Sequence, residues 1–170
     1  CYAEPLFSGG AFGPGYNEKY ETLSIDVPED VVKAEIFALI TGHGWGKDAA
    51  NCAEFCNHTH HFTVNGTTFD RTHRSAGTVD GCINEVANGV VPNQWGTWPY
   101  GRAGWCPGQD VKSYRLDITD ILQSGANEFS YRALFQGRDY APQPAPNANN
   151  NGFAANIEMT SYLVMSCKEE

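Results

Sequence analysis

One short stretch of the chain concentrates the residue types that carry out chemistry. Residues 51–66 read NCAEFCNHTHHFTVNG and contain two cysteines, one carboxylate and three histidines. A disulfide between Cys52 and Cys56 would close a tight loop and push Glu54 outward at its tip. We therefore expect the chemistry of this protein, whatever it is, to lie in this stretch.

The segment that follows this loop is predicted to be extended. Its aromatic and β-branched residues favour a strand, and the strand ends at Asn65-Gly66, a strong hairpin-turn signal. Side chains two residues apart in a strand share a face. His58 and His60 therefore point one way, and His61 points the other.

This arrangement leaves two alternatives for the histidine pair. His58 and His60 can bind one metal ion, because neutral imidazole is the commonest metal ligand. Alternatively, two histidines on a half-buried strand hydrogen-bond to the backbone and bind nothing. An HxH spacing is short and common, so the spacing alone favours the second alternative.

The elements that must position these residues are predicted to be strands. The chain has 170 residues, which suits one domain, and its 18 glycines, 9 prolines and short hydrophobic runs indicate an all-β sandwich. Residues 1–19 are expected to be an irregular lead-in, and residues 41–46 a glycine-rich loop that lets the backbone approach a ligand or the next loop closely. The predicted strands are residues 20–27, 31–40, 58–64, 67–69, 112–118, 127–136 and 156–167.

Composition excludes several classes of protein. The net charge of −9 argues against nucleic acid and anionic membrane surfaces as partners. No apolar run approaches the length of a membrane span. No signal peptide is visible, so the chain is expected to start as a mature or trimmed protein.

Six cysteines indicate disulfides and an oxidising compartment. Six cysteines allow fifteen pairings, and sequence alone does not choose among them. We expect Cys1–Cys167, which would join the two ends of the chain, together with Cys52–Cys56 and Cys82–Cys106. A zinc site is the disfavoured alternative, since paired CxxC knuckles are missing. The sequons at Asn57 and Asn65 fit a secreted protein.

A long polar and aromatic segment, residues 70–110, adds a second candidate surface. A loop of this length is usually functional or cross-linked. Its aromatic residues Trp95, Trp98, Tyr100 and Trp105 suit a sugar-binding surface on which ring faces stack against pyranose C–H groups. The alternative is that they cover the end of the sandwich as a minor core.

Four motifs resemble, in order, the C-terminal domain of the peptide-N-glycosidase F family. They are residues 41–44 (TGHG), 52–56 (CAEFC), 59–60 (TH) and 102–108 (RAGWCPG). The resemblance extends over about residues 20–166, and the joint match of the second and fourth motifs is highly specific. It implies an eight-stranded antiparallel jelly-roll sandwich over residues 1–170, and it supports the pairs Cys52–Cys56 and Cys82–Cys106, which that family forms.

This resemblance also implies a function. Members of the family cleave the bond between asparagine and the first N-acetylglucosamine of an N-glycan, in a site between two jelly rolls. By match, Glu54 takes the position of one functional glutamate, and Arg102 and Trp105 match residues lining the same cleft. The other key acid of the family lies in a first jelly roll that this chain does not contain. Alone the chain would hold half a site, so a second domain or a partner chain is expected to supply the rest.

A second resemblance points to copper. The C-terminal copper domain of peptidylglycine α-hydroxylating monooxygenase has the same fold, an HTHH strand and a later Glu-Met, which are matched here by residues 58–61 and 158–159. In that family the first and third positions of HTHH and the methionine bind copper. The corresponding residues here are His58, His60 and Met159, and two imidazoles with a thioether suit Cu(I).

Three functions follow from these patterns. The first is a secreted or extracellular glycan-directed module, a glycoamidase acting on N-linked glycans only together with a missing domain or partner. Its candidate residues are Glu54 as the catalytic residue and Arg102, Trp105, Trp95 and Trp98 for substrate binding. The second is a mononuclear copper-binding domain. The third is a structural or adhesive extracellular module, in which the cysteines and tryptophans only hold the loops.

Overall fold

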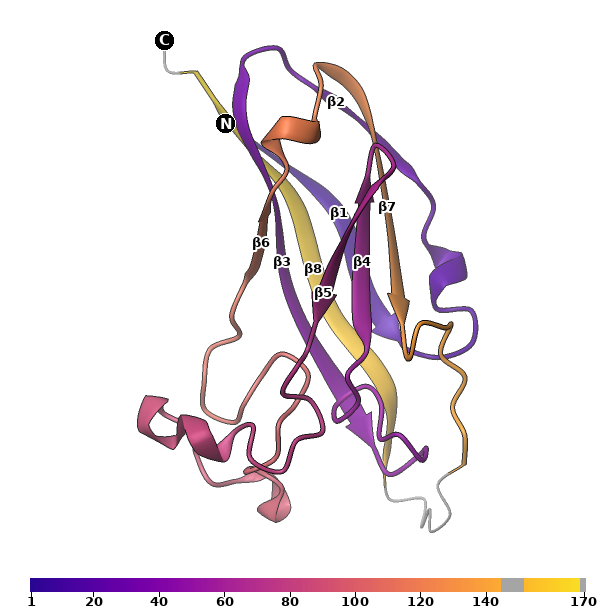
Figure 1. The fold of residues 1–170 in the computed structure, drawn as a ribbon, viewed down its shortest axis with the longest axis vertical. Coiled ribbons are helices and arrows are strands. Elements are labelled where there is room, and N and C mark those ends of the chain that lie inside the picture. Colours follow the sequence, from indigo (N-terminus) through magenta and orange to yellow (C-terminus); the bar gives the residue numbers. More distant parts are fainter. Residues whose placement is uncertain (145–151, 169–170) are drawn as a thin grey trace.

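Eight strands form two antiparallel sheets that lie face to face (Figure 1). The computed structural model describes residues 1–144 and 152–168. The strands are β1 (Tyr2–Ala11), β2 (Leu23–Val27), β3 (Val31–Trp45), β4 (Thr59–Val64), β5 (Thr67–Thr72), β6 (Tyr114–Asp117), β7 (Gly125–Leu134) and β8 (Phe153–Cys167). Short helical turns lie between them: η1 (Asn17–Lys19), η2 (Ile83–Asn88), η3 (Gln94–Gly96) and η4 (Thr119–Ile121).

The strand order defines a jelly roll. One sheet has the order β1-β8-β3-β6 and the other has the order β2-β7-β4-β5, so most neighbours in a sheet come from distant parts of the chain. Two interleaved sheets of this kind are the double Greek key of a jelly roll. The predicted eight-stranded antiparallel sandwich is therefore confirmed.

Alternating side chains build the core between the sheets. On β3 the predicted inward face, Ala34 to Ile40 in steps of two, is buried. On β8 the predicted face is buried along its whole length, from Ile157 to Met165. The hairpin predicted at Asn65-Gly66 joins β4 to β5, with Val64 opposite Thr67.

Two predictions about the first half of the chain were wrong. Residues 2–11 are not an irregular lead-in but the edge strand β1, which pairs with β8 from Tyr2↔Met165 to Ala11↔Asn156. Residues 41–45 are not a loop but the end of β3. The glycines there serve close packing rather than a turn, because a Cβ on Gly42 would overlap the carbonyl oxygen of Ala53. The expected close approach of this segment to the next loop is thus confirmed.

The three expected disulfides are all present. Cys1–Cys167, Cys52–Cys56 and Cys82–Cys106 have Cα–Cα distances of 5.7, 4.9 and 5.6 Å, within the usual range for such bonds. The first joins the start of β1 to the end of β8, and the other two lie in the long connections.

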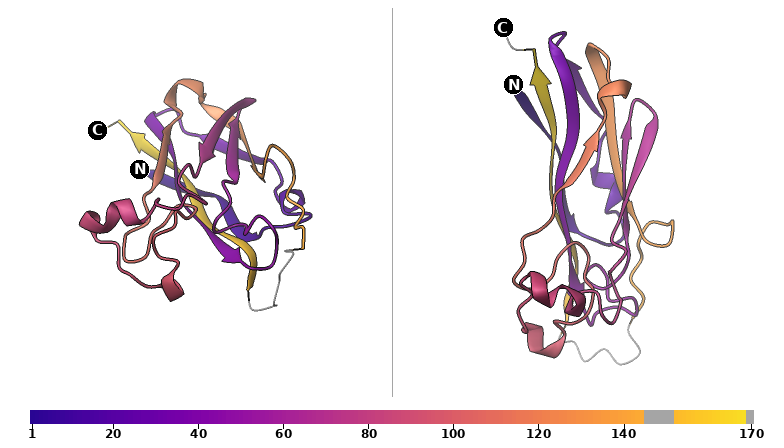
Figure 2. Two further views of the ribbon diagram at one scale, coloured as in Figure 1. Left: turned by 60° about the horizontal axis from the view of Figure 1, so that its bottom comes forward. Right: turned by 60° about the vertical axis from the view of Figure 1, so that its left-hand side comes forward.

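These long connections gather at one end of the sandwich. Figures 1 and 2 show the segments after β3 and after β5 together at the end opposite the two termini. Residues far apart in sequence, such as Glu54 and Arg102, meet there. Among the described residues, no helix is long and apolar enough to cross a membrane.

Candidate functional site

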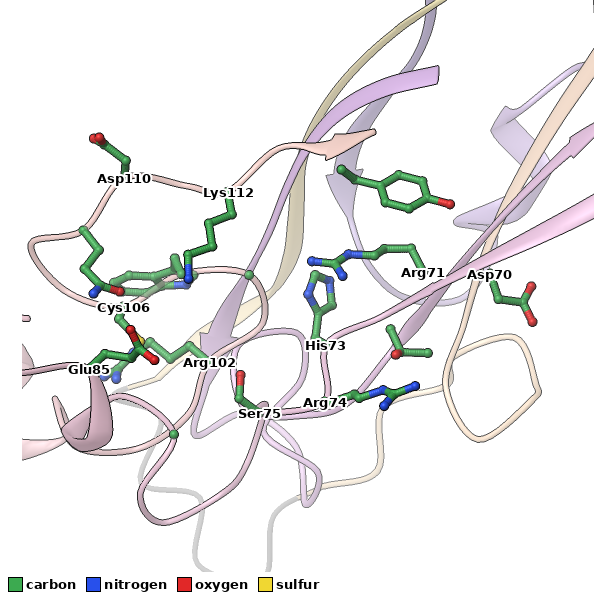
Figure 3. Close-up of a pocket in the computed structure, with 16 residues that line it drawn as sticks. Asp70, Arg71, His73, Arg74, Ser75, Glu85, Arg102, Cys106, Asp110 and Lys112 are labelled. Atoms are coloured by element: carbon green, nitrogen blue, oxygen red, sulfur yellow. The ribbon is translucent and has the colours of Figure 1, made fainter. Parts of the chain in front are cut away.

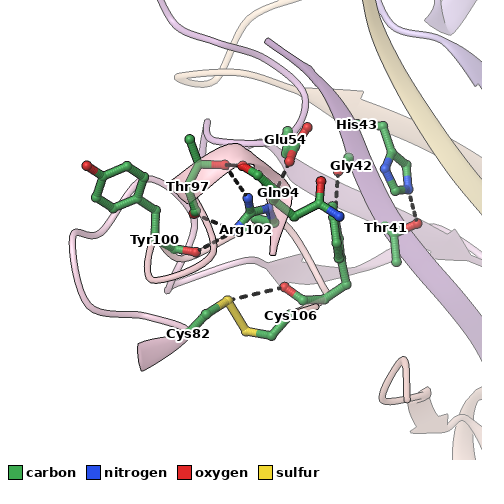
Figure 4. Close-up of polar contacts among 11 residues, drawn as sticks. Thr41, Gly42, His43, Glu54, Cys82, Gln94, Thr97, Tyr100, Arg102 and Cys106 are labelled. Carbon is green, nitrogen blue, oxygen red and sulfur yellow. Dashed lines mark hydrogen bonds and ion pairs between the residues drawn. A yellow bond between two sulfur atoms is a disulfide. The ribbon is translucent and has the colours of Figure 1, made fainter. Parts of the chain in front are cut away.

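The two charged residues expected at the site form one buried ion pair. Nε of Arg102 donates to Oε1 of Glu54 over 2.8 Å (Figure 4). The side chain of Arg102 is fully buried and that of Glu54 is 10% exposed. A buried charge of this kind is tolerated only when it is paired and hydrogen-bonded.

The other nitrogens of Arg102 hold the aromatic loop. They donate to the carbonyl oxygens of Thr97 and Tyr100 at 3.0 and 3.1 Å and to the hydroxyl of Thr97 at 2.9 Å. The guanidinium also lies about 5 Å from the ring centres of Phe55 and Trp105, as cation–π contacts require. Arg102 thus orients Glu54 and the loop around it, and its own side chain is fully buried.

Backbone hydrogen bonds fix the same three segments to one another. Ala103 donates to the carbonyl of Glu54 at 2.9 Å, and Gly42 on β3 donates to the carbonyl of Ala103 at 2.9 Å. The indole Nε1 of Trp105 donates to the carbonyl of Gly42 at 3.0 Å, and its ring lies 5.3 Å from that of His43. The motifs that were separate in sequence therefore form one rigid unit at the end of β3.

Glu54 faces a groove of about 740 Å³ with mostly apolar walls. The lining residues are Trp45, Asn51, Glu54, Phe55, Gly77, Val79, Gln94, Trp95, Thr97 and Tyr100. Trp95 is fully exposed, and its backbone has φ 51° and ψ 36°, in the left-handed region. Glu54 is the only acidic residue among these lining residues, so the described part of the chain offers the groove a single carboxylate.

The expected site residues therefore divide into two groups. Glu54 and Trp95 line the groove together with Tyr100, which belongs to the aromatic surface expected from the sequence. Trp45 and Phe55 also line it, and the sequence did not single them out as site residues. Arg102 and Trp105 lie behind it as a support. Trp98 lies in a neighbouring depression that it shares with Trp95, outside the groove that contains Glu54.

A second cavity, of about 590 Å³, has Arg102 in its wall (Figure 3). Its wall is polar and carries charges of both signs, from Asp70, Arg71, Arg74, Glu85, Arg102, Asp110 and Lys112. Figure 3 shows His73 beside Arg71 in this wall. One buried histidine, His73, therefore lines this cavity.

The two histidines expected to share a face are joined by a third. His58, His60 and His73 are all buried, and each has a ring nitrogen within 4.8 Å of one on the other two. Nε2 of His60 lies 3.0 Å from Nε2 of His73. His61 points to the other face of the strand, as predicted, where its Nδ1 lies 2.6 Å from Oδ1 of Asp70.

These three imidazoles are neutral at neutral pH. Burial lowers the pKa of His58 to about 4, although its contact with the Cys56 carbonyl opposes this. Burial, and then the neighbouring His58 and Arg71, lower the pKa of His73 to about 3. Burial and the neighbouring histidines also hold the pKa of His60 well below its usual value. Neutral imidazole is the form that binds metals.

Met159 was expected as the third metal ligand. It lies on β8 in the opposite sheet, paired with Ile40 of β3, and its side chain belongs to the hydrophobic core. Among the His, Cys, Asp and Glu side chains of the described residues, His73, directly after β5, is the one that lies with His58 and His60.

Fold and site together define a disulfide-bonded jelly roll that presents one carboxylate in an aromatic groove built by its loops. The model of the family "Peptide-N-glycosidase F, C terminal" matches residues 15–164. The chain belongs to this family.

Known relatives agree with this assignment. Peptide-N(4)-(N-acetyl-beta-D-glucosaminyl)asparagine amidase F of Elizabethkingia miricola is 36% identical over 118 residues, which are 66% of this chain and 31% of the relative. The structure of the glycosylasparaginase PNGase F from Flavobacterium meningosepticum superposes with a TM-score of 0.73 at 22% identity, over 99% of this chain and 52% of that one. PNGF-II superposes with a TM-score of 0.61 at 16% identity, over 99% of this chain and 30% of that one. The chain thus covers between 30% and 52% of the length of these three relatives.

Proposed function

We propose that this protein is a glycan-directed module that binds the core of an N-linked glycan in the groove of Glu54. One observation carries this proposal: a fixed carboxylate lies in a groove whose walls include Trp45, Trp95 and Tyr100. Aromatic rings stack on the apolar faces of sugars, and a carboxylate accepts hydrogen bonds from their N–H and O–H groups. The amidase activity named for the Elizabethkingia relative agrees with such a ligand.

In this proposal the module supplies part of a glycoamidase site. Glu54 orients the sugar amide or transfers a proton at the bond to asparagine, and Arg102 keeps its carboxylate in place. A second acidic group comes from another jelly-roll domain or from a partner chain. The single carboxylate of the groove supports this division, as does the match to only half of the PNGase F chain.

We also propose that the protein works outside the cytosol. All six cysteines are disulfide-bonded, which suits an oxidising compartment.

Binding of an N-glycopeptide, followed by tryptophan fluorescence and calorimetry, tests the proposal directly. We expect saturable binding that Trp95→Ala weakens. Tyr2→Ala is the matched control, because Tyr2 is also an exposed aromatic residue but lies on β1, near the termini. Equal loss in both variants, or no binding by the wild type, would contradict the assignment of the groove.

Catalysis is tested separately, with a denatured N-glycoprotein and the first jelly-roll domain of a relative added in trans. If the module completes the site, glycan release appears only in the mixture, and Glu54→Gln abolishes it. Glutamine keeps an oxygen that can accept from Arg102, so this variant removes the charge with little change of shape. Release that is unchanged by Glu54→Gln would remove Glu54 from the chemistry.

The observation that favours a second function is the histidine cluster. A copper-binding function is proposed from the residues of this chain alone.

A further inference from the structure

The histidine cluster follows from the register of one hairpin. In the β4–β5 pair Thr59 lies opposite Thr72, so the next residues outward are His58 and His73. Residues directly opposite each other in an antiparallel pair place their side chains on the same face. His60 is two residues from His58 on the same strand and shares that face. Three imidazoles from two adjacent chain segments thus meet inside the sandwich.

The spacing of their nitrogens suits one small ion. Ligand nitrogens bound at about 2 Å around a single ion lie roughly 3.3 Å from one another. Nε2 of His60 and Nε2 of His73 are already 3.0 Å apart, and a nitrogen of His58 lies within 4.8 Å of both. Small rotations of the rings are enough to bring all three nitrogens to one point.

In two of the rings, the nitrogen that points away from the centre of the cluster contacts an oxygen atom, as in known metal sites. Nδ1 of His58 lies 3.2 Å from the carbonyl of Cys56, and Nδ1 of His60 lies 2.7 Å from the hydroxyl of Tyr131. Metal-binding histidines almost always use the second ring nitrogen in this way. These contacts leave Nε2 of His58 and Nε2 of His60 to face His73.

Two nitrogens in this group lack a hydrogen-bond partner. Nε2 of His58 and Nδ1 of His73 are both buried and make no hydrogen bond among the described residues, and of the two it is Nε2 of His58 that can face an ion held between the rings. Buried polar atoms are nearly always satisfied, and each exception calls for an explanation. An ion bound between the three rings would satisfy Nε2 of His58.

The charges around the three histidines determine which kind of ion the site favours. The partners of the three rings are the carbonyl oxygen and the disulfide sulfur of Cys56, the phenol of Tyr131 and aromatic rings, and among the described residues none of these partners is a carboxylate. Figure 3 shows the positively charged Arg71 beside His73 in the cavity wall, where its charge disfavours a further positive charge. Because the cost of burying an ion rises with the square of its charge, a monovalent ion fits this site better than a divalent one. Among imidazole-binding metals this indicates Cu(I).

We propose that His58, His60 and His73 bind one Cu(I) ion in the core of the sandwich. This assignment differs from the set suggested by the monooxygenase resemblance, because His73 is a ligand and Met159 is not required. The ion enters through the polar cavity, whose wall includes His73. The proposal is independent of glycan binding, because the cluster and the groove of Glu54 share no lining residue.

The test is an anaerobic titration of the disulfide-intact protein with Cu(I), with ascorbate as the reductant and bathocuproine disulfonate as the competing chelator. We expect one Cu(I) per chain. His73→Gln should weaken binding by at least about tenfold, the minimum expected when even an outer partner of a ligand is removed. His61→Gln is the matched control, because His61 lies on the same strand but faces outward. It should leave the affinity unchanged.

Substitution of a buried histidine can also disturb folding, so a second measurement uses the wild-type protein. The chain has five histidines, and ¹H–¹⁵N correlation spectra of the imidazoles resolve each of them. Cu(I) should shift the nitrogens of His58, His60 and His73 and leave those of His43 and His61 in place. Shifts confined to His43 and His61, or no competition with the chelator, would overturn the proposal.

Met159→Leu separates the two ligand sets. Retained affinity supports the three-histidine site. Loss of binding in Met159→Leu, with binding retained in His73→Gln, would replace it with the set His58, His60 and Met159. Stoichiometric Zn²⁺ binding at the three histidines without Cu(I) binding would overturn the choice of ion.

Discussion

Arg102 and Glu54 are 48 residues apart in sequence and meet in a buried hydrogen bond of 2.8 Å. The same guanidinium donates to Thr97 and Tyr100, so one side chain connects the disulfide loop at residues 52–56 to the aromatic loop at residues 97–105. Both loops contribute to the groove proposed to bind glycans, through Glu54, Phe55, Thr97 and Tyr100. The shape of the groove therefore depends on a residue that does not itself line it.

Arg102→Met should destabilise the protein by about 3–5 kcal/mol, because it leaves Glu54 as a buried charge without a partner. The carbonyls of Thr97 and Tyr100 also lose their donor. The free energy of unfolding in urea measures this effect. Arg102→Lys should restore only part of it, because an ammonium group cannot reproduce the planar fork.

Arg132→Met is the matched control for this prediction. Arg132 also pairs with a carboxylate, Asp139, at 2.9 Å, but both side chains are more than half exposed. Exposed pairs contribute about 0–1 kcal/mol. Similar losses in the two variants would show that burial of the Arg102 pair does not determine its contribution.

Gly42→Ala should be among the most damaging single changes in the chain. A Cβ at this position would overlap the carbonyl oxygen of Ala53 and lie 2.8 Å from Cε1 of His58. Because the first of these neighbours is backbone, the disulfide loop would have to move away from β3. We expect a loss of about 3 kcal/mol in the free energy of unfolding, the upper end of the usual range for overpacking.

Gly13→Ala provides the comparison for Gly42→Ala. A Cβ on Gly13 meets no atom within 4 Å, and its backbone is not in the left-handed region. Thermal unfolding of this variant should resemble that of the wild type. A Gly42→Ala protein that is equally stable would mean that the contact between β3 and the loop is not close in solution.

The sequence predicted the regular part of the fold because its strands alternate. Such alternation marked both faces of β3 and the whole of β8. Strand β1 was not predicted, because it is an edge strand with bulges, a proline and two glycines. Of its residues only Phe7 is buried. A strand that buries one side chain leaves no period-two pattern to detect.

The candidate site was predictable only in part, for a similar reason. Motifs identified Glu54, but the burial of Arg102 depends on acceptors supplied by the backbone of a distant loop. The position of His73 could have been predicted from the hairpin at Asn65-Gly66. When the pairing Val64↔Thr67 is continued outward along both strands, residue 73 lies opposite residue 58. The register of the two strands, rather than the spacing of the motifs, predicts that His73 joins His58 and His60.

The three disulfides should stabilise the protein in the order of the loops that they close. The sequence separations are 166 residues for Cys1–Cys167, 24 for Cys82–Cys106 and 4 for Cys52–Cys56. Loop-closure entropy then gives contributions of about 5, 3.5 and 2 kcal/mol. Denaturant unfolding of the three double Cys→Ser variants measures the order. If removal of Cys52–Cys56 costs the most, geometry in the native state outweighs chain entropy.

Trp95 combines full exposure with a left-handed backbone. Its exposed ring contributes no burial energy to folding, and its backbone conformation is unfavourable. Trp95→Gly should therefore raise the free energy of unfolding by up to about 1 kcal/mol, because glycine adopts this conformation without strain. If the ring stacks on a sugar, the same change should weaken glycopeptide binding by about 0.5–1.5 kcal/mol, the usual contribution of an aromatic contact. Urea unfolding and glycopeptide calorimetry measure the two effects on one protein.

Two further variants distinguish the effect of the left-handed backbone from the effect of the aromatic ring. Gln136→Gly relieves a left-handed residue with φ 51° in the turn after β7, outside the groove, and should raise stability without changing glycan affinity. Trp95→Tyr keeps an aromatic face and should retain most of the affinity. An affinity that falls equally in Gln136→Gly and Trp95→Gly would assign the loss to global changes. If Trp95→Gly binds the glycopeptide as tightly as the wild type, the Trp95 ring is not part of the glycan site.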